Sequence, residues 1–253
     1  MVTREPTEVI IIGTTHGRHH DAKRYTAAEL ERVLLATQPD AIAVEMESGS
    51  FPADGRIRED ECNYQDFPEL RVIARASRQL AVTVFPFDRE GKNEYYQEMR
   101  YFDRFNRALE EKAKWVKRLQ AQSPGCIALE LAGCLDEAIK AQEALDREAT
   151  SEMVNSEAYD CVVRVKHALL FSVLPELMKK DAQCKGAVED YRFLANEWNE
   201  RNRSMADNIV AIASQLSGRR LAVTTGGDHR FILRDLLADK PGITLKEFWE
   251  VLP

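Results

Sequence analysis

The sequence predicts an α/β fold, in which a central, mostly parallel sheet has flanking helices and a large helical insertion between its third and fourth strands. Two short apolar runs, residues 9–13 and 221–227, are rich in β-branched residues and end in glycine, as buried strands of parallel sheets do. Between residues 93 and 216, apolar residues instead recur with helical spacing and glycines are few. We therefore expect one domain over residues 1–253, with a sheet core of 1–92 and 217–253 and a helical insertion of 93–216.

The first ninety residues alternate between strand and helix signals. After the run at 9–13, Thr26 and Glu29 form a T-x-x-E capping-box signature that opens a helix. A second strand is expected at residues 41–46, a helix at 68–79 and a third strand at 80–87. Strands that alternate with helices in this way pair in parallel through crossover connections.

Helical patterns fill the insertion. One long helix has five apolar residues close to one face, and Pro124 and Gly125 end it. Those five are Tyr101, Phe105, Leu109, Val116 and Leu119. Further helices are expected at 127–147, 157–179 and 188–216, followed by a strand at 221–225, a helix at 229–238 and a strand within 243–252. The insertion could cap the active edge of the sheet or form the surface of a homodimer.

Composition narrows the class of partner and the compartment. The 253 residues include 35 basic and 42 acidic side chains, and a net charge of −7 disfavours a general attraction to nucleic acid or anionic membranes. Small molecules or peptides are the expected partners. Five cysteines without a CxxC pair argue against a disulfide framework or a structural zinc site and favour a reducing compartment. The polar N-terminus and the lack of an apolar run near the roughly 18 residues that span a bilayer favour a cytoplasmic protein.

A similar short motif closes the first and the fourth predicted strands. The GTTH motif ends at His16 and the GGDH motif ends at His229. If both strands lie in one parallel sheet, the two imidazoles meet at its carboxyl edge, where open α/β folds usually bind their ligands. A lone histidine after a glycine turn is usually a loop or capping residue, but the repetition of the motif favours a shared functional site.

Other strand ends also carry polar side chains, which rigid strands can hold while short loops leave them facing solvent. These residues are Arg18 after the first strand, Glu45 and Glu47 at the second, Asp88 and Arg89 at the third, and Asp228 at the fourth. Two histidines with a carboxylate form a common ligand set for a catalytic divalent ion, so His16, Glu45 and His229 are the candidate metal ligands. Such an ion would lower the pKa of its bound water toward neutrality.

Each of these residues also has a structural interpretation. An unpaired Glu45 in a buried strand would be costly, so an internal salt bridge is the alternative to catalysis. The arginines considered for that bridge are Arg18, Arg89 and Arg201. Glu47 lies nearer the loop and is expected either to be solvated or to support the site without binding at its centre. Asp88 and Arg89 could cap the segment that follows them, and Asp228 could be the N-cap of the last long helix.

Several residues outside these strand ends have open roles. His19 and His20 are expected in a mobile loop near the entrance, and His167 is expected to be structural because it lies on the apolar face of a predicted helix. Glu200 and Arg201 could form a surface ion pair on their helix. Short polar residues nearby favour instead a helix end that faces the site. These are Asn202, Ser204 and Asp207.

Taken together, the motifs resemble the TraB/Tiki family, which includes the pheromone-shutdown and GumN-like proteins. This family lies within a superfamily that also holds erythromycin esterases and ChaN-like haem-binding proteins. The resemblance rests on five pieces in the same order: GTTH, PDAIAVEME, the Asp-Arg of FPFDRE, ERNRSMA and GGDH. They cover residues 8–51, 80–90 and 197–237 and leave the helical middle unmatched. The family usually has a further glycine a few residues after its second motif, whereas this chain reads RFIL there.

The resemblance implies an α/β fold whose two GxxH motifs face one pocket. Tiki-like members are regarded as metal-dependent proteases. The matching motifs imply a catalytic centre of four residues here, with three further residues that support it. The central residues are His16, Glu45, Arg201 and His229, and the supporting ones are Asp88, Arg89 and Glu200. Five residues are the candidates for substrate binding. They are Arg18, Asp88, Arg89, Glu200 and Asp228.

The leading hypothesis is a cytoplasmic, metal-dependent hydrolase of the TraB/Tiki type that cleaves an amide or ester bond in a small peptide-like substrate. Glu45 or Glu47 would be the general base, and Arg201 or Arg89 would stabilise the oxyanion. In a metal-free alternative, similar to that suggested by erythromycin esterases, His16 is the base and Glu45 orients it.

Two non-catalytic alternatives stay open. A ChaN-like protein would bind haem or another small ligand, with an accessible histidine or loop tyrosine as axial ligand. The tyrosines considered are Tyr25, Tyr64, Tyr95 and Tyr96. An interaction module would instead bind another protein through its helical lobe, and its histidine pair would have no catalytic role.

Overall fold

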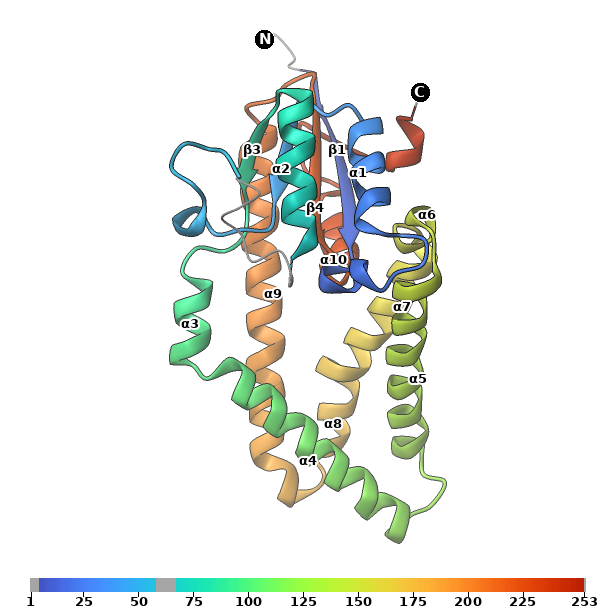
Figure 1. The fold of residues 1–253 in the computed structure, drawn as a ribbon. Coiled ribbons are helices and arrows are strands. Elements are labelled where there is room, and N and C mark those ends of the chain that lie inside the picture. Colours follow the sequence, from blue (N-terminus) through green and yellow to red (C-terminus); the bar gives the residue numbers. More distant parts are fainter. Residues whose placement is uncertain (1–4, 58–66, 253) are drawn as a thin grey trace. The chain divides into compact units, whose positions relative to one another are not determined.

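A computed structural model describes residues 5–57 and 67–252 and confirms the predicted α/β fold (Figure 1). Within the described residues, five parallel strands form one sheet in the order β3-β2-β4-β1-β5. Their bounds are β1 Thr7–Thr14, β2 Ala41–Val44, β3 Thr83–Pro86, β4 Arg220–Gly226 and β5 Ile243–Lys246. A large helical segment lies between β3 and β4, as expected. None of the described helices is long and apolar enough to cross a membrane.

The chain forms two compact units. The sheet unit comprises residues 1–90, 143–160 and 202–253, and the helical unit comprises 91–142 and 161–201. One boundary, between Glu90 and Gly91, lies outside the helices, and the other three fall within α5 (Ile127–Glu148), α7 (Glu157–Ala168) and α9 (Lys185–Ala213). Two stretches of the predicted insertion, 143–160 and 202–216, thus belong to the sheet unit. The expectation of a single domain stays a prediction.

The first and fourth strands of the sheet are direct neighbours. Gly13 of β1 pairs with Thr225 of β4, and Thr14 pairs with Gly226. Because the strands are parallel, their carboxyl ends lie at the same edge. The two histidine motifs therefore begin side by side.

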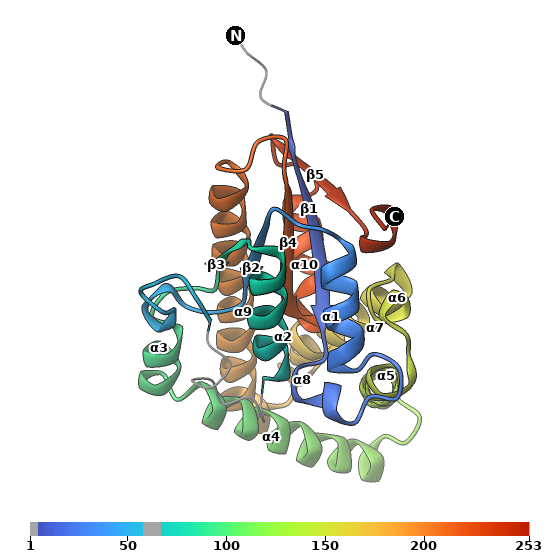
Figure 2. The same ribbon diagram turned by 45° about the horizontal axis from the view of Figure 1, so that its top comes forward.

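Both faces of the sheet are covered within the sheet unit. On one face, Val9 and Val223 share a core with Ile209 of α9 (Lys185–Ala213) and Leu233 of α10 (Gly227–Leu237). Side chains alternate along a strand, so Ile10 points to the other face. There Figure 2 shows α1 (Ala27–Ala36) and α2 (Pro68–Leu80). Fully burying such an aliphatic side chain is worth about 1.5–3 kcal/mol, which makes the sheet a rigid support.

The start of α1 forms as its sequence signature predicts, but only in part. The Thr26 hydroxyl accepts a hydrogen bond from the backbone N–H of Glu29 at 3.3 Å. The Glu29 carboxylate binds the Arg32 guanidinium and the Ser151 hydroxyl. Thr26 therefore caps the helix, while the carboxylate of the box stabilises neighbouring side chains.

Several predicted boundaries were wrong by a few residues. The second strand ends at Val44, so Glu45 follows the strand instead of interrupting it. Leu80 ends α2 and does not begin β3. The expectation that Asp228 is an N-cap was also wrong, because α10 begins at Gly227 with Gly226 as N-cap. Asp228 instead lies in the first turn, where an acidic group is favourable to the helix dipole.

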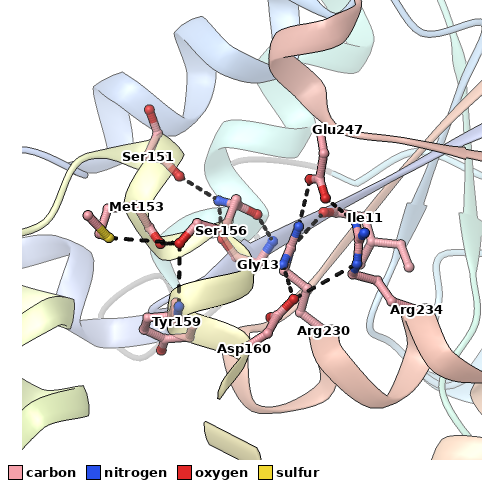
Figure 3. A network of polar contacts seen from close by, with 11 residues as sticks. Ile11, Gly13, Ser151, Met153, Ser156, Tyr159, Asp160, Arg230, Arg234 and Glu247 are labelled. Atoms are coloured by element: carbon pink, nitrogen blue, oxygen red, sulfur yellow. Dashed lines mark hydrogen bonds and ion pairs between the residues drawn. The ribbon is translucent and has the colours of Figure 1, made fainter. Parts of the chain in front are cut away.

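A buried arginine of α10 connects this helix to β1, to α7 and to the C-terminal segment (Figure 3). Arg230 of α10 is fully buried, and its guanidinium bonds the carboxylates of Asp160 and of Glu247, the latter at 2.6 Å. Its Nε also donates to the carbonyl oxygen of Ile11 at 3.4 Å. Arg234 contacts the same two carboxylates. This network ties α10 to β1, to the start of α7 (Glu157–Ala168) and to the C-terminal segment.

The helical unit contains α3 (Lys92–Glu98), α4 (Tyr101–Gln122), α8 (Leu174–Met178) and parts of α5 (Ile127–Glu148), α7 and α9. Its core includes Trp115, Leu135 and Tyr191. The short α6 (Ser151–Val154) belongs to the sheet unit.

The helix predicted over residues 157–179 is confirmed as a helical segment over 157–178, but a π-helical turn at Leu169–Val173 separates α7 from α8. Pro175 lacks an N–H for the carbonyl four residues earlier. A wider turn accommodates that loss.

Candidate functional site

His16 is held from two sides at the end of β1. Its backbone has φ 49°, a left-handed conformation that is uncommon for residues other than glycine. The Nδ1 atom lies 2.5 Å from Oε1 of Glu69, which is buried in the first turn of α2. The other edge of the ring rests on Gly226, where a Cβ would lie 2.3 Å from Nε2. The direction of Nε2 is thereby defined.

The surroundings of His16 favour its protonated form. Burial alone would lower its pKa, but the hydrogen bond to Glu69 and the negative charges of Glu45, Glu69 and Asp228 outweigh that effect. They raise the pKa from 6.5 to about 9. In the absence of a bound cation, His16 is therefore positively charged at neutral pH.

Glu45 lies between the two motifs. Its Oε2 accepts hydrogen bonds from the Thr225 hydroxyl at 2.7 Å and from the Gly226 N–H at 2.8 Å. Its Oε1 lies 3.6 Å from Nε2 of His229. Gly226 thus touches the carboxylate through its N–H and the His16 ring through its open Cα.

His229 is anchored in the first turn of α10. It is 4% exposed, and its Nδ1 lies 2.7 Å from Oδ1 of Asn202. Because an amide oxygen can only accept, Nδ1 of His229 carries a proton and donates it to Asn202. Both imidazoles are therefore bonded to an acceptor at Nδ1 and leave Nε2 for the site.

Three buried oxygens beside this centre have no hydrogen-bond partner among the described residues. They are Thr14 Oγ1, Thr15 Oγ1 and Glu69 Oε2. Buried polar groups are ordinarily paired, so these three oxygens are candidates to contact a water, an ion or a polar ligand. Thr14 lies opposite Gly226 in the sheet, which places its hydroxyl at the same edge.

The predicted residues at the other strand ends have varied surroundings. Glu47 is 5% exposed, so the interpretation that it is solvated was wrong, while its supporting role at the site stays a prediction. Asp88 is buried, and its Oδ1 accepts from the N–H of Arg89 at 2.8 Å, while the N-cap of the next helix, α3, is Gly91 without a side-chain cap. Arg18 binds the carboxylates of Asp146 at 2.5 Å and Glu143 at 3.7 Å and is not the partner of Glu45.

His19 corrects the expectation of a mobile histidine loop. Residues His16–His20 form a 3-10 helix in which His19 is 2% exposed. Its Nδ1 donates to the carbonyl oxygen of Tyr25 at 2.7 Å, and its Nε2 accepts from the N–H of Thr15 at 3.1 Å. Burial lowers the pKa of His19, and both contacts require the neutral ring. His19 is a structural residue that fixes the turn after β1.

Residues of the helical unit are described separately. Glu200 and Arg201 belong to this unit, and their role in the site stays a prediction. His167 is buried, with ring centroids 5.3 Å from Phe171 and 4.7 Å from Trp198, which agrees with the structural role expected for it.

Two of the tyrosines considered as axial ligands, Tyr25 and Tyr96, are buried. Tyr25 is fully buried and donates its hydroxyl to the carbonyl oxygen of Gly13 at 2.9 Å, while burial raises its pKa. Tyr95 and Tyr96 lie in α3 and not in a loop. Tyr64 lies outside the described residues.

Two functional candidates became visible only in three dimensions. Glu69 follows Pro68 at the start of a predicted helix, where an acidic residue usually stabilises the helix terminus. Its distance of 53 positions from His16 gave no hint of the contact. Asn202 stood out only as part of a polar helix segment, and its bond to His229 gives it a definite role.

The donor types at this site suit a divalent ion. Two imidazoles whose Nδ1 atoms are fixed by acceptors, together with a carboxylate, are ordinary ligands and supporting contacts for zinc or a similar metal. Within residues 5–57 and 67–252, no three histidine, cysteine or acidic side chains already stand close enough to hold an ion. The ligand chemistry fits, although the side chains form no preassembled cage.

No family model matches this chain, and comparisons with curated proteins and with solved structures found no significant match. The resemblance to the TraB/Tiki family stays a prediction based on the five motifs.

Proposed function

We propose that this chain is a hydrolase that activates water at the carboxyl ends of β1, β2 and β4 to cleave an amide or ester bond in a small peptide-like substrate. The observation that carries the proposal is the meeting of His16 and His229 at Glu45 and Gly226. Each imidazole has its Nδ1 bonded to an acceptor. The resemblance to the TraB/Tiki family supports the same reaction class.

The chain's own residues have separate tasks in this reaction. Glu45, held by Thr225 and Gly226, is a fixed carboxylate that can accept a proton from water. His229 directs Nε2 toward that carboxylate, since Asn202 binds its Nδ1. Arg89 would stabilise the oxyanion, as the motifs imply.

A divalent ion held by His16, Glu45 and His229 would supply hydroxide at neutral pH by lowering the pKa of its bound water. His16 must lose a proton before it can bind such an ion, because its pKa is about 9 in the metal-free protein. Affinity for the ion is thus expected to rise with pH.

The metal-free route, with His16 as general base, makes a different demand. A base needs a neutral imidazole, and His16 is neutral only above about pH 9. In that route Glu69 and not Glu45 orients the ring, since Glu69 bonds Nδ1. Hydrolysis that persists in a chelator and increases above pH 9 would favour it.

The test is the metal content of the purified protein together with hydrolysis of a panel of peptide and ester substrates. His16→Ala and His229→Ala should each lower the metal content and abolish the hydrolysis. His20→Ala is the matched control, since His20 is an exposed residue of the same 3-10 helix. Unchanged hydrolysis in both site variants would show that another site carries the activity, or that the activity does not belong to this protein.

A further inference from the structure

Glu69 has an unusual position for an acidic residue. It lies in the first turn of α2, directly after Pro68, and is 7% exposed. Among the described residues, its Oε1 bonds Nδ1 of His16 and its Oε2 has no hydrogen-bond partner. One side of the carboxylate is thus committed to the imidazole.

Stability of the helix does not account for this burial. An acidic residue in a first turn interacts favourably with the helix dipole from a solvated position, for about 0.3–1 kcal/mol. A buried oxygen without a partner costs about 1–3 kcal/mol, more than that gain. The balance favours a role of Glu69 toward His16.

His16 needs such an anchor to keep one orientation. Its side chain is 43% exposed, so solvent leaves room for other rotamers. A left-handed backbone directs the side chain, and the open Cα of Gly226 receives the ring edge. Neither feature fixes which ring nitrogen faces Gly226. The bond to Glu69 does, because it engages Nδ1 and leaves Nε2 on the opposite side.

We infer that Glu69 is the positioning residue of the site, which holds Nδ1 of His16 so that Nε2 stays beside Gly226 and the Glu45 carboxylate. The inference deepens the proposed function and rests on it for the consequence to hydrolysis. Carboxylates that bond the second nitrogen of a ligand histidine fix the ring, and their loss weakens metal affinity by about 10–100-fold.

Two substitutions separate the hydrogen bond from the charge. Glu69→Ala removes the acceptor, whereas Glu69→Gln keeps an oxygen that can accept from Nδ1. Ser77→Ala is the control on the same helix, because the described bond of its hydroxyl is to the carbonyl oxygen of Ala74. A positioning role predicts that the glutamine variant retains much of what the alanine variant loses.

The first measurement is NMR of the metal-free protein with ¹⁵N-labelled histidine. We expect a protected, downfield Nδ1–H signal of His16 in the native protein and in Ser77→Ala, an upfield shift of it in Glu69→Gln, and its loss in Glu69→Ala. Absence of the signal in the native protein, or its persistence in Glu69→Ala, would overturn the inference. Should Glu69→Ala fail to fold, an unshifted signal in Glu69→Gln would overturn it equally.

The second measurement is Mn²⁺ affinity by calorimetry. Glu69→Ala should bind about 10–100-fold more weakly than the native protein, and Glu69→Gln should fall between them. Equal affinity of all three would contradict the inference. If the native protein binds no Mn²⁺ while the NMR signal behaves as expected, the metal centre fails and the positioning role stands.

Discussion

Gly226 accommodates the imidazole of His16 because it lacks a side chain. A Cβ at this position would lie 2.3 Å from Nε2 and 3.1 Å from Cε1 of that ring. The φ of Gly226 is −56°, which any residue adopts, so space and not backbone conformation requires glycine here. Since the same residue donates its N–H to Glu45, it sets the spacing between the imidazole and the carboxylate.

Gly226→Ala should therefore abolish activity and also lower stability. The His16 ring must move aside and lose its bond to Glu69, so we expect the free energy of unfolding to fall by about 1–3 kcal/mol. Urea unfolding and a hydrolysis assay measure the two effects.

Gly133→Ala is the control for this substitution. Gly133 lies within α5, and nothing stands within 4 Å of an added Cβ. Alanine there should stabilise the protein by about 0.5–1 kcal/mol and leave hydrolysis intact. A fully active Gly226→Ala variant would contradict the fit of His16 to this glycine.

Thr225→Val tests the support of Glu45. The substitution removes a hydroxyl that donates to the carboxylate at 2.7 Å and keeps the shape of a β-branched side chain. We expect at least a tenfold drop in Mn²⁺ affinity and in hydrolysis, because hydrogen bonds to charged groups are worth about 1.5–3 kcal/mol.

Its neighbour Thr224 provides the comparison. Thr224 is equally buried, and its hydroxyl donates to the carbonyl oxygen of Ala43 at 3.0 Å. Thr224→Val should cost about 1 kcal/mol of stability and leave the site unchanged. Similar losses of activity in both variants would indicate a general disturbance of β4.

Stability should depend on pH through His16. The folded protein holds this proton more tightly than the unfolded chain, with a pKa of about 9 against 6.5. The stabilisation from His16 is thus fully present below pH 6.5 and is lost as pH rises through about 9. The difference in unfolding free energy between the native protein and His16→Ala should shrink from pH 6 to pH 10, and an equal difference at both pH values would refute the charged imidazole.

Arg230→Met should be among the most destabilising substitutions. It removes a fully buried guanidinium that bridges the Asp160 and Glu247 carboxylates (Figure 3). Removing one partner of a buried ion network costs about 3–5 kcal/mol, because charges stay buried without their counterion.

Arg32→Met tests the same change at the surface. Arg32 pairs with Glu29 one turn away and is 55% exposed, so its loss should cost less than about 1 kcal/mol. Urea unfolding of both variants measures the contrast. A cost of Arg230→Met similar to that of Arg32→Met would show that the network contributes little.

Local patterns predicted most of the sheet unit. Runs of β-branched residues predicted the strands β1 and β4, and Pro68 predicted the start of α2. The end of β4 was harder to predict, because Gly226 is both the last residue of the strand and the N-cap of α10, with no loop between them. A pair of glycines usually indicates a loop, so Asp228 was predicted to precede the helix as its N-cap.

Contacts between distant positions escaped prediction at the site. The histidine motifs indicated His16 and His229, because each carries its own local signature. Glu69 and Arg230 carry none: one resembles an ordinary helix-start acid and the other a surface arginine of a short amphipathic helix. Their roles depend on strand order, which places β4 between β1 and β2 and which periodicity does not encode.

The central claim is that imidazoles from the first and fourth strands serve one centre. Pulsed electron paramagnetic resonance of the Cu²⁺-loaded protein counts the imidazoles bound to a single ion. We predict two in the native protein and one in each of His16→Ala and His229→Ala. A single imidazole in the native protein, or a count that either substitution leaves unchanged, would contradict the shared centre.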